Sequence, residues 1–148
     1  MRISDVLSVK GASIVSVRAD QPLIAAITLM TKRKVGSVIV LDLSGRPLGI
    51  VSEPDIVASI SEQGAACLHQ DARLAMRAPP PKCAPDHSVS EALARMTRDR
   101  VRYLLVVDGE KLLGLVSIGD LVKARLESTE LEARVLRDMA RGKLLAGA

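Results

Sequence analysis

Hydrophobic residues recur along this chain with two different spacings, which alternate from one segment to the next. Residues 14–17 alternate between apolar and polar positions, as a short strand does, whereas residues 22–34 carry apolar side chains on one helical stripe. The apolar runs over 37–43 and 48–51 are separated by turn residues and predict a β-hairpin. A helix over 52–63 is expected to follow.

The same order of elements is expected in the second half of the chain, with stronger local signals. A capping-box sequence opens a predicted helix over 89–100. Residues 102–108 and 112–116 predict a second hairpin. A long helix is then expected over 118–140, closed by Gly142.

The two series of elements come from an internal repeat of about 65 residues. Short helices over 3–8 and 70–77 are expected to open the two copies. A unit of this length buries its own hydrophobic face poorly, so the copies are expected to pack together about a pseudo-twofold axis. The predicted fold class is α/β (α+β), with two β-α-β-β-α repeats, a long C-terminal helix and a functional surface at the seam. The positions that match include Asp20 with Asp86, Met30 with Met96, Val40 with Val106, Gly49 with Gly114, Ser52 with Ser117 and Asp55 with Asp120.

The repeat predicts three parts. Residues 1–66 form the first repeat, 67–126 the second, and 127–148 a C-terminal helix and tail. The tail helix carries an incomplete apolar seam beyond the repeat. Such a face is typical of packing on a parent domain or on a second subunit, and we expect a homodimer.

Composition excludes several classes of protein. The chain has 148 residues, of which 48% are hydrophobic and 26% charged, as expected of a globular domain with an ordinary core. No apolar run reaches the roughly 18 residues needed to span a bilayer. Residues 1–10 lack the apolar stretch of a signal peptide. We therefore expect a cytoplasmic protein without a membrane partner.

The net charge of +4 raises the question of a nucleic-acid partner. The basic residues are scattered, and many lie beside acidic ones. Tyr103 is the single aromatic residue, so the chain has no set of rings on which bases could stack. We interpret the charge as a solvated surface and expect no nucleic-acid partner.

The two cysteines, Cys67 and Cys83, show no Cys-x-x-Cys spacing. Neither lies near a pair of histidines that could complete a metal site. We expect two free thiols and no bound metal.

The strongest candidate for chemistry is a Ser-x-x-Asp sequence at the end of each hairpin. Ser52 with Asp55, and Ser117 with Asp120, lie where a strand is expected to lead into a helix. Either pair is also a good capping box, and capping alone would explain a single copy. However, a helix N-terminus with a serine hydroxyl binds phosphate, and a carboxylate one turn away can bind two ribose hydroxyls. Two copies at matching positions favour a ligand, and one pair can serve both roles.

These repeats resemble a tandem pair of cystathionine β-synthase-type (CBS) domains, the arrangement called a Bateman module. The resemblance covers residues 3–140, and residues 101–108 and 114–123 carry it most clearly. It is similar to the small stand-alone bacterial members. It implies a regulatory module that binds an adenosine-containing ligand (AMP, ADP, ATP, NAD or S-adenosylmethionine) between the repeats. It also implies disc-like dimers, and signalling to a regulated partner that the sequence does not identify.

The resemblance implies two clefts, each built from both repeats. In the cleft ranked first, Ser117 and Asp120 would hold phosphate and ribose, and Arg102 would lie by the phosphates. The other residues expected there are Val15, Val35, Gly36 and Leu115.

In the second cleft, Ser52 and Asp55 would take the polar roles. Ile50, Pro81 and Val101 would line it, with Arg102 on the opposite wall and Gly36 in place of the arginine. Similar proteins often carry an arginine where Pro54 stands, and its loss would weaken phosphate binding. For this reason the Ser117/Asp120 cleft is ranked first.

The sequence bears on two rival functions. An enzyme is disfavoured because no Gly-x-Ser-x-Gly sequence or glycine-rich phosphate loop occurs, and neither His69 nor His87 accompanies a plausible nucleophile. A purely structural dimerisation module with vestigial clefts remains as the alternative to a nucleotide sensor.

Overall fold

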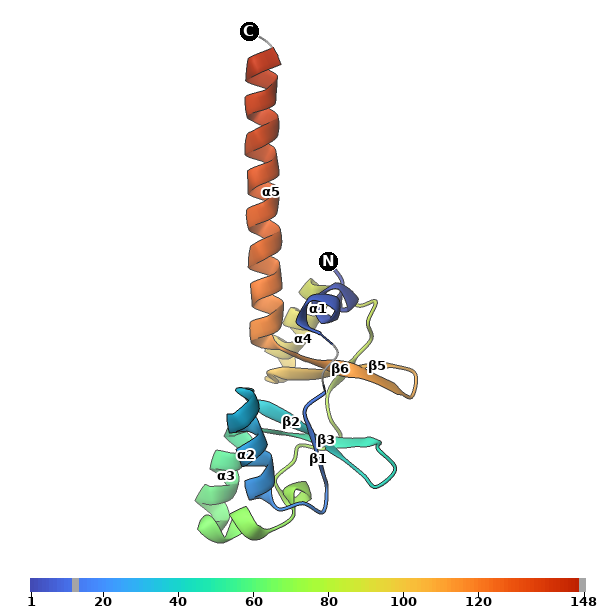
Figure 1. Ribbon diagram of the computed structural model, residues 1–148, viewed down its shortest axis with the longest axis vertical. Coiled ribbons are helices and arrows are strands. Elements are labelled where there is room, and N and C mark those ends of the chain that lie inside the picture. The colour runs from blue at the N-terminus through green and yellow to red at the C-terminus, as the bar shows by residue number, and fades with distance from the viewer. Residues whose placement is uncertain (12–13, 147–148) are drawn as a thin grey trace.

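The computed structural model describes residues 1–11 and 14–146 and folds the two repeats into two halves of one design (Figure 1). The first half contains β1 (Ser16–Arg18), α2 (Leu23–Arg33), β2 (Ser37–Leu41), β3 (Pro47–Ser52) and α3 (Glu53–Gln63). The second contains β4 (Lys82–Cys83), α4 (Val89–Asp99), β5 (Tyr103–Asp108), β6 (Lys111–Ser117) and α5 (Ile118–Ala146). Helix α1 (Ile3–Lys10) precedes them, and the 3₁₀ turns η1 (Ala65–His69) and η2 (Ala72–Leu74) join the halves. The predicted fold class is confirmed.

Each half contains a three-stranded sheet with the same topology. In the first half, β1 pairs parallel to β2, and β2 pairs antiparallel to β3. In the second half, β4, β5 and β6 repeat this order and these directions. Two parallel neighbours need a crossover connection, which α2 and α4 provide. The central strand β2 is buried on both faces over Ser37–Val40, which explains its continuous apolar run.

The two sheets face each other across the seam between the halves, and the helices lie outside them (Figure 1). Three buried side chains, Ile39, Ile50 and Leu105, form the centre of this contact. Partly buried Leu41, Tyr103 and other residues surround them. Because the sheets pack directly on each other, the ends of β3 and β6 come to lie beside the opposite half.

The short helix that opens the chain packs in the second half. Ile3 and Val6, three residues apart on one helical face, are buried with Met96 and Leu104. The backbone N–H of Ile3 also donates to the carbonyl of His87 at 2.9 Å. Helix α1 therefore belongs to the second core, far from its neighbours in sequence.

The connector between the repeats packs in the first half. Cys67 and Ala72 are buried in the core of the first half. The predicted boundaries at 66 and 126 remain predictions. However, the segment before each repeat packs in the core of the other half: α1 in the second core, and the connector in the first. Residues 12–13 and 147–148 of the predicted parts lie outside the described residues.

Several predicted elements differ from the structure; for example, the strand expected over 37–43 ends at Leu41. The first strand begins at Ser16 and not at residue 14. Residues 70–77 do not form a helix; η2 is a single 3₁₀ turn, because backbone groups of this stretch bond to the first half, as in Ala72 N–H to Gln21 O at 2.7 Å. Helix α5 continues past Gly142 to Ala146, because one glycine costs a helix only about 1 kcal/mol.

Because α1 packs in the second core, truncating a buried side chain of this helix should destabilise the protein more than truncating an exposed one. Ile3→Ala should lower the free energy of unfolding by about 2–4 kcal/mol, because it opens a cavity in the second core. Val9→Ala in the same helix should change it by less than about 0.5 kcal/mol, because Val9 is 85% exposed. Urea unfolding of both variants measures the difference. Equal effects would contradict the assignment of α1 to this core.

Candidate functional site

Two cavities lie at the seam, one beside each Ser-x-x-Asp sequence, and each has a volume of about 280 Å³. Both draw residues from the two halves, as the pseudo-twofold arrangement requires. The Ser52/Asp55 cavity is lined by Ile50, Ser52, Pro54, Asp55, Arg77, Pro81, Arg100, Val101, Arg102 and Tyr103. The Ser117/Asp120 cavity is lined by Lys10, Gly11, Ile14, Val15, Lys34, Val35, Gly36, Ser37, Ile39, Tyr103, Gly114, Leu115, Ser117 and Asp120.

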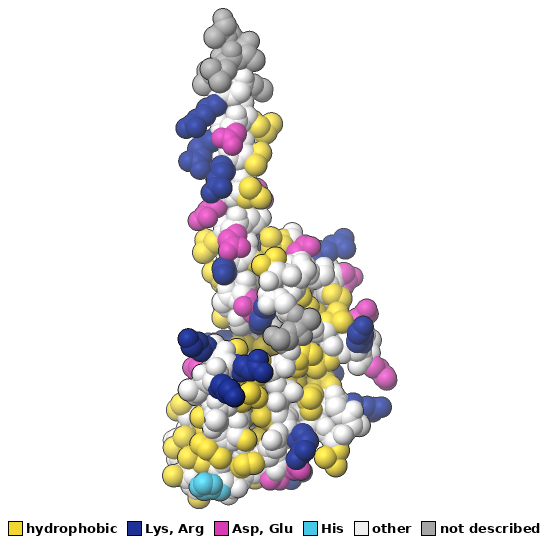
Figure 2. Space-filling model, in the orientation of Figure 1, with side chains coloured by type: hydrophobic (Ala, Val, Ile, Leu, Met, Phe, Trp, Pro, Cys, Tyr) yellow, Lys and Arg dark blue, Asp and Glu magenta, His cyan; other side chains and the backbone are white. Residues whose placement is uncertain are grey.

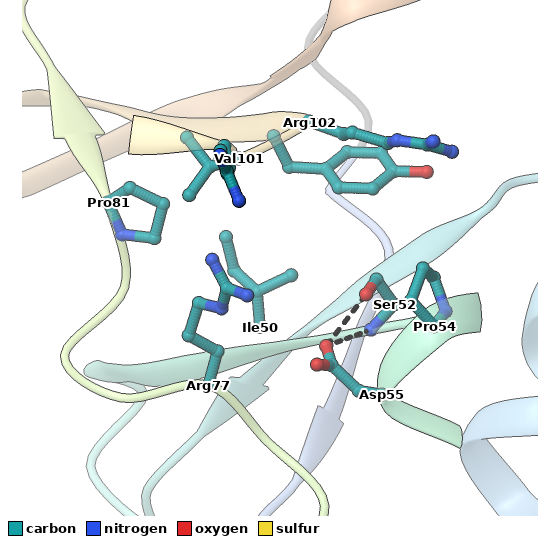
Figure 3. Close-up of a pocket in the computed structure, with 10 residues that line it drawn as sticks. Ile50, Ser52, Pro54, Asp55, Arg77, Pro81, Val101 and Arg102 are labelled. Atoms are coloured by element: carbon teal, nitrogen blue, oxygen red, sulfur yellow. Dashed lines mark hydrogen bonds between the residues drawn. The ribbon is translucent and has the colours of Figure 1, made fainter. Parts of the chain in front are cut away.

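In the Ser52/Asp55 cavity, Asp55 is held by Ser52, the residue that precedes its helix. The backbone N–H of Ser52 donates to Asp55 Oδ2 at 2.9 Å, and the hydroxyl of Ser52 donates to the same oxygen at 2.7 Å. Both bonds are drawn in Figure 3. Within the described part of the chain, Asp55 Oδ1 accepts no hydrogen bond. The carboxylate is thus fixed in position with an acceptor available at the cavity.

Arg77 places a cation inside this cavity, and its backbone is fixed there by two hydrogen bonds. Its N–H donates to Ile50 O at 2.8 Å, and the N–H of Ile50 donates to Arg77 O at 3.2 Å. This approach requires Gly49, since a Cβ there would lie 2.6 Å from Arg77 O. In Figure 3 the Arg77 guanidinium points into the cavity, between Ile50 and Val101.

Two more arginines line the same cavity from the second half. Arg100 follows α4 in the left-handed conformation, with φ of 53°. Arg102 also lines it, although in Figure 3 its side chain runs outward past the cavity. Three arginines therefore line a cavity that also holds a carboxylate, and the Arg77 guanidinium points into it, so the site can bind a ligand with hydroxyl and phosphate groups.

In the other cavity, Asp120 already has a cationic partner. Its Oδ2 accepts from the backbone N–H of Ser117 at 2.8 Å and from Lys10 Nζ at 2.7 Å. The Ser117 hydroxyl in turn accepts from the backbone N–H of Asp120 at 3.0 Å, which completes a capping box. Burial would raise the pKa of the Asp120 carboxyl, but the bonds from Lys10 and Ser117 outweigh burial and lower that pKa.

The repeat alignment shows why the two cavities differ in charge. Continuing the match of Met30 with Met96 along the chain sets Gly11 against Arg77, Lys34 against Arg100 and Gly36 against Arg102. Two of the three arginines thus have glycine as their counterpart in the Ser117/Asp120 cavity. The Ser52/Asp55 cavity is therefore the more favourable site for an anion.

Tyr103 lies between the cavities and lines both of them. A Cβ at Gly36 would lie 2.4 Å from its hydroxyl oxygen, so the absence of a side chain at Gly36 makes room for the phenol. Burial and then the charge of Glu53 raise the pKa of the Tyr103 phenol, against an opposing hydrogen bond with Ser37. Because the chain has no Trp or Phe, tyrosine fluorescence reports on this seam alone.

The structure brings together most of the residues that the sequence placed in each cleft. All residues predicted for the second cleft line the Ser52/Asp55 cavity except Gly36, which lines the Ser117/Asp120 cavity. All those predicted for the first cleft line the Ser117/Asp120 cavity except Arg102. Arg102 immediately precedes β5 and lines the Ser52/Asp55 cavity instead. The ligand roles of these residues remain predictions.

Among the charged and aromatic residues that line the two cavities, sequence reasoning missed Lys10, Lys34, Arg77, Arg100 and Tyr103. Tyr103 could have been suspected as the single aromatic residue in the chain. Arg77 and Lys10 gave no local signal, because each reaches its cavity through a segment that crosses the seam.

No cluster of three or more His, Cys, Asp or Glu side chains suited to a metal occurs among residues that the structure describes. Cys67 and Cys83 are free and buried. Burial raises the pKa of the Cys83 thiol to about 11, against a smaller effect of Arg95. Over the same residues, no helix combines the length and apolar character of a membrane span.

A family model described as CBS domain matches the chain twice, over residues 3–62 and 71–127. Among solved structures, a CBS-domain-containing protein from Agrobacterium tumefaciens is 35% identical, with a TM-score of 0.81, over 84% of this chain and 92% of that one. A CBS domain protein from Pyrobaculum aerophilum, complexed with AMP, is 26% identical, with a TM-score of 0.76, over 90% of this chain and 99% of that one.

A curated relative is the human 5′-AMP-activated protein kinase subunit gamma-3, which is 27% identical over 70% of this chain. The match covers 22% of that subunit. The chain spans about half or less of the length of several curated relatives that it matches.

The environment of Asp120 predicts a pH-dependent contribution to stability. A lowered pKa means that ionised Asp120 stabilises the fold above its unfolded pKa of about 3.9, and that this stabilisation is lost as the pH falls through the folded value. Asp120→Asn should therefore lower the free energy of unfolding by roughly 0.5–1 kcal/mol at neutral pH and by less near about pH 3, where part of the carboxylate is protonated.

Urea unfolding at the two pH values measures this difference, and exposed Asp20 provides the control as Asp20→Asn. A loss of the same size at both pH values would show that the charge of Asp120 does not contribute.

Proposed function

This chain belongs to the CBS-domain family, and on that basis we propose that it is a regulatory module that binds an adenosine-containing nucleotide at the seam between its two repeats. The observation that carries the proposal is the Ser52/Asp55 cavity, which holds a fixed carboxylate, the Arg77 guanidinium and two further lining arginines. Carboxylates accept hydrogen bonds from ribose hydroxyls, and guanidinium groups bind phosphate oxygens.

The remaining wall of this cavity suits a purine base. Ile50, Pro81 and Val101 provide apolar contacts from both halves of the protein. Backbone groups of neighbouring strands can read the ring nitrogens and the exocyclic amine of adenine. Base, ribose and phosphate thus each find suitable chemistry in one cavity.

The charge of the two cavities supports the opposite ranking from the one expected from sequence. The absence of an arginine at Pro54 suggested that the Ser52/Asp55 site would be the weaker one. Arg77, Arg100 and Arg102 supply cations there from other segments. We therefore place the tighter site at Ser52/Asp55 and assign AMP as the first ligand to test, since a structural neighbour is complexed with AMP. ATP and NAD share its adenosine.

A module that only binds a nucleotide must act on another protein, so the proposal includes a regulated partner. It also includes a second copy of the chain, for which α5 offers a surface. Leu131, Val135 and Met139 are exposed along the part of α5 that projects from the body. Figure 2 shows hydrophobic side chains on one side of this helix and Lys and Arg on the other. We propose that this face lies in a homodimer.

The proposed function predicts different losses for two changes in one cavity. Asp55→Asn should weaken both AMP and adenosine by about tenfold to a hundredfold, because it removes the acceptor of the ribose hydroxyls. Arg77→Gln should weaken AMP by about tenfold or more and leave adenosine nearly unchanged, because it removes a phosphate contact. Titration followed by calorimetry and by Tyr103 fluorescence measures both ligands.

Arg73→Gln is the matched control for Arg77→Gln, since Arg73 is an exposed arginine of the same connector outside this cavity. Affinity in the control should equal that of the unmodified protein. If no adenine nucleotide binds the unmodified protein or raises its melting temperature, the sensor is contradicted and a purely structural module is favoured.

Dimer formation has its own test. Light scattering at micromolar concentration should give a mass of about 32 kDa, twice the 15.8 kDa chain. Leu131→Asp should shift the mass toward the monomer, because it places a charge on the apolar face of α5. Leu43→Asp, at an exposed hairpin position, should not. A monomeric unmodified protein would contradict the proposal.

A further inference from the structure

The Lys10 ammonium lies in the Ser117/Asp120 cavity and bonds to two of the acceptors that line it. Lys10 Nζ donates to Asp120 Oδ2 at 2.7 Å and to the backbone carbonyl of Leu115 at 2.9 Å. The exposed fractions of the Lys10 and Asp120 side chains are 35% and 27%. The contact therefore lies at the mouth of the cavity, where a ligand would enter.

These two acceptors are the groups that a nucleoside would use. A carboxylate at the start of α5 is the acceptor for ribose hydroxyls, and a carbonyl of β6 is an acceptor for an exocyclic amine. An ammonium carries three N–H donors, so it satisfies both acceptors without a ligand. A nucleoside that uses these two acceptors competes with the ammonium for them.

At the Ser52/Asp55 cavity, the position that corresponds to Lys10 is not a lysine. The repeat alignment sets Met76 against Lys10, and Met76 packs in the core of the first half. Its sulfur would lie 2.8 Å from a Cβ at Gly49, which shows how closely it approaches β3. Throughout the described ranges, Asp55 forms no ion pair within 4.0 Å. The two carboxylates therefore differ in whether the chain itself supplies a donor.

We propose that Lys10 acts as an internal competitor for nucleosides in the Ser117/Asp120 cavity and thereby makes the two sites unequal. This inference rests on the proposed function, because it assigns the same ribose-binding role to Asp120 as to Asp55. Lys10 is then a specificity-determining residue: it directs a single nucleotide to the Ser52/Asp55 site, and the second site fills at higher concentration.

The test uses AMP and the full chain in an Asp55→Asn background, which weakens the competing site. The backbone amide of Gly114, which lines the Ser117/Asp120 cavity, reports occupancy of that site by NMR. Lys10→Met keeps the aliphatic stem and removes the ammonium. It should tighten AMP at this site by about fivefold, the effect expected from removing a partly exposed ion pair.

Two further variants decide the cause of any gain. Lys34→Met removes another lysine of the same cavity, one that forms no hydrogen bond to Asp120 within the described residues, and it should give no gain. Lys10→Met should also give no gain when Asp120 is replaced by Asn, because the competition requires that carboxylate. A ligand-free check is the Asp120 carboxyl, whose pKa should rise in Lys10→Met. The dispersion of the amide spectrum shows separately that the variant is folded.

The outcomes separate this inference from the function on which it rests. Weaker or unchanged AMP binding at Gly114 in Lys10→Met, while the Ser52/Asp55 site of the unmodified protein binds AMP, overturns the competitor role alone. An unchanged Asp120 pKa in Lys10→Met also overturns it, because the ion pair would then be absent in solution. If AMP binds neither site in any of these proteins, both the proposed function and this inference are wrong.

Discussion

The contact between the two sheets is the constraint on which the rest of this structure depends. Ile39 and Ile50 from one half meet Leu105 from the other, and all three are nearly inaccessible to water. Burial of such side chains stabilises the contact by about 1.5–3 kcal/mol each relative to exposure. Because this apolar contact occupies the middle of the seam, the polar ends of β3 and β6 lie at its margins. The two cavities form there, and each needs both halves.

The segments before each repeat reinforce the same seam by crossing it. Helix α1 packs in the second core, and the connector packs in the first. This exchange ties the halves together through the backbone as well as through side chains. It also has a chemical consequence, because Lys10 ends one crossing segment and Arg77 lies in the other. Each of these segments therefore brings one cation to a cavity: α1 brings Lys10, and the connector brings Arg77.

Pseudo-symmetry of the backbone does not give symmetry of charge. Glycines at 11 and 36 leave one cavity without the guanidinium groups that Arg77 and Arg102 supply to the other. Lys10 adds a cation to the less basic cavity but places it on the carboxylate. A repeat with the same fold can therefore provide one site suited to a phosphate-bearing ligand and one in which a carboxylate is already paired. Such inequality is a simple way for a module with two sites to respond over two ranges of ligand concentration.

The sequence by itself determined the repeat, the order of elements and the two Ser-x-x-Asp sequences, because these depend on local periodicity and on helix capping. The stripe through Leu23, Ala26 and Met30 is one example, and each of these side chains is buried in the first core. The seam location of the sites also followed, since a short repeat must bury its apolar face against its copy.

The tertiary structure alone decided which cations face which carboxylate. Arg102 follows the helix of one repeat and lines the cavity of the other Ser-x-x-Asp pair, whereas the family resemblance had placed it in both clefts. Lys10 and Asp120 are separated by 110 residues and meet because α1 packs in the second half. No local pattern encodes such a meeting, because it depends on how the packed halves place segments that are distant in sequence.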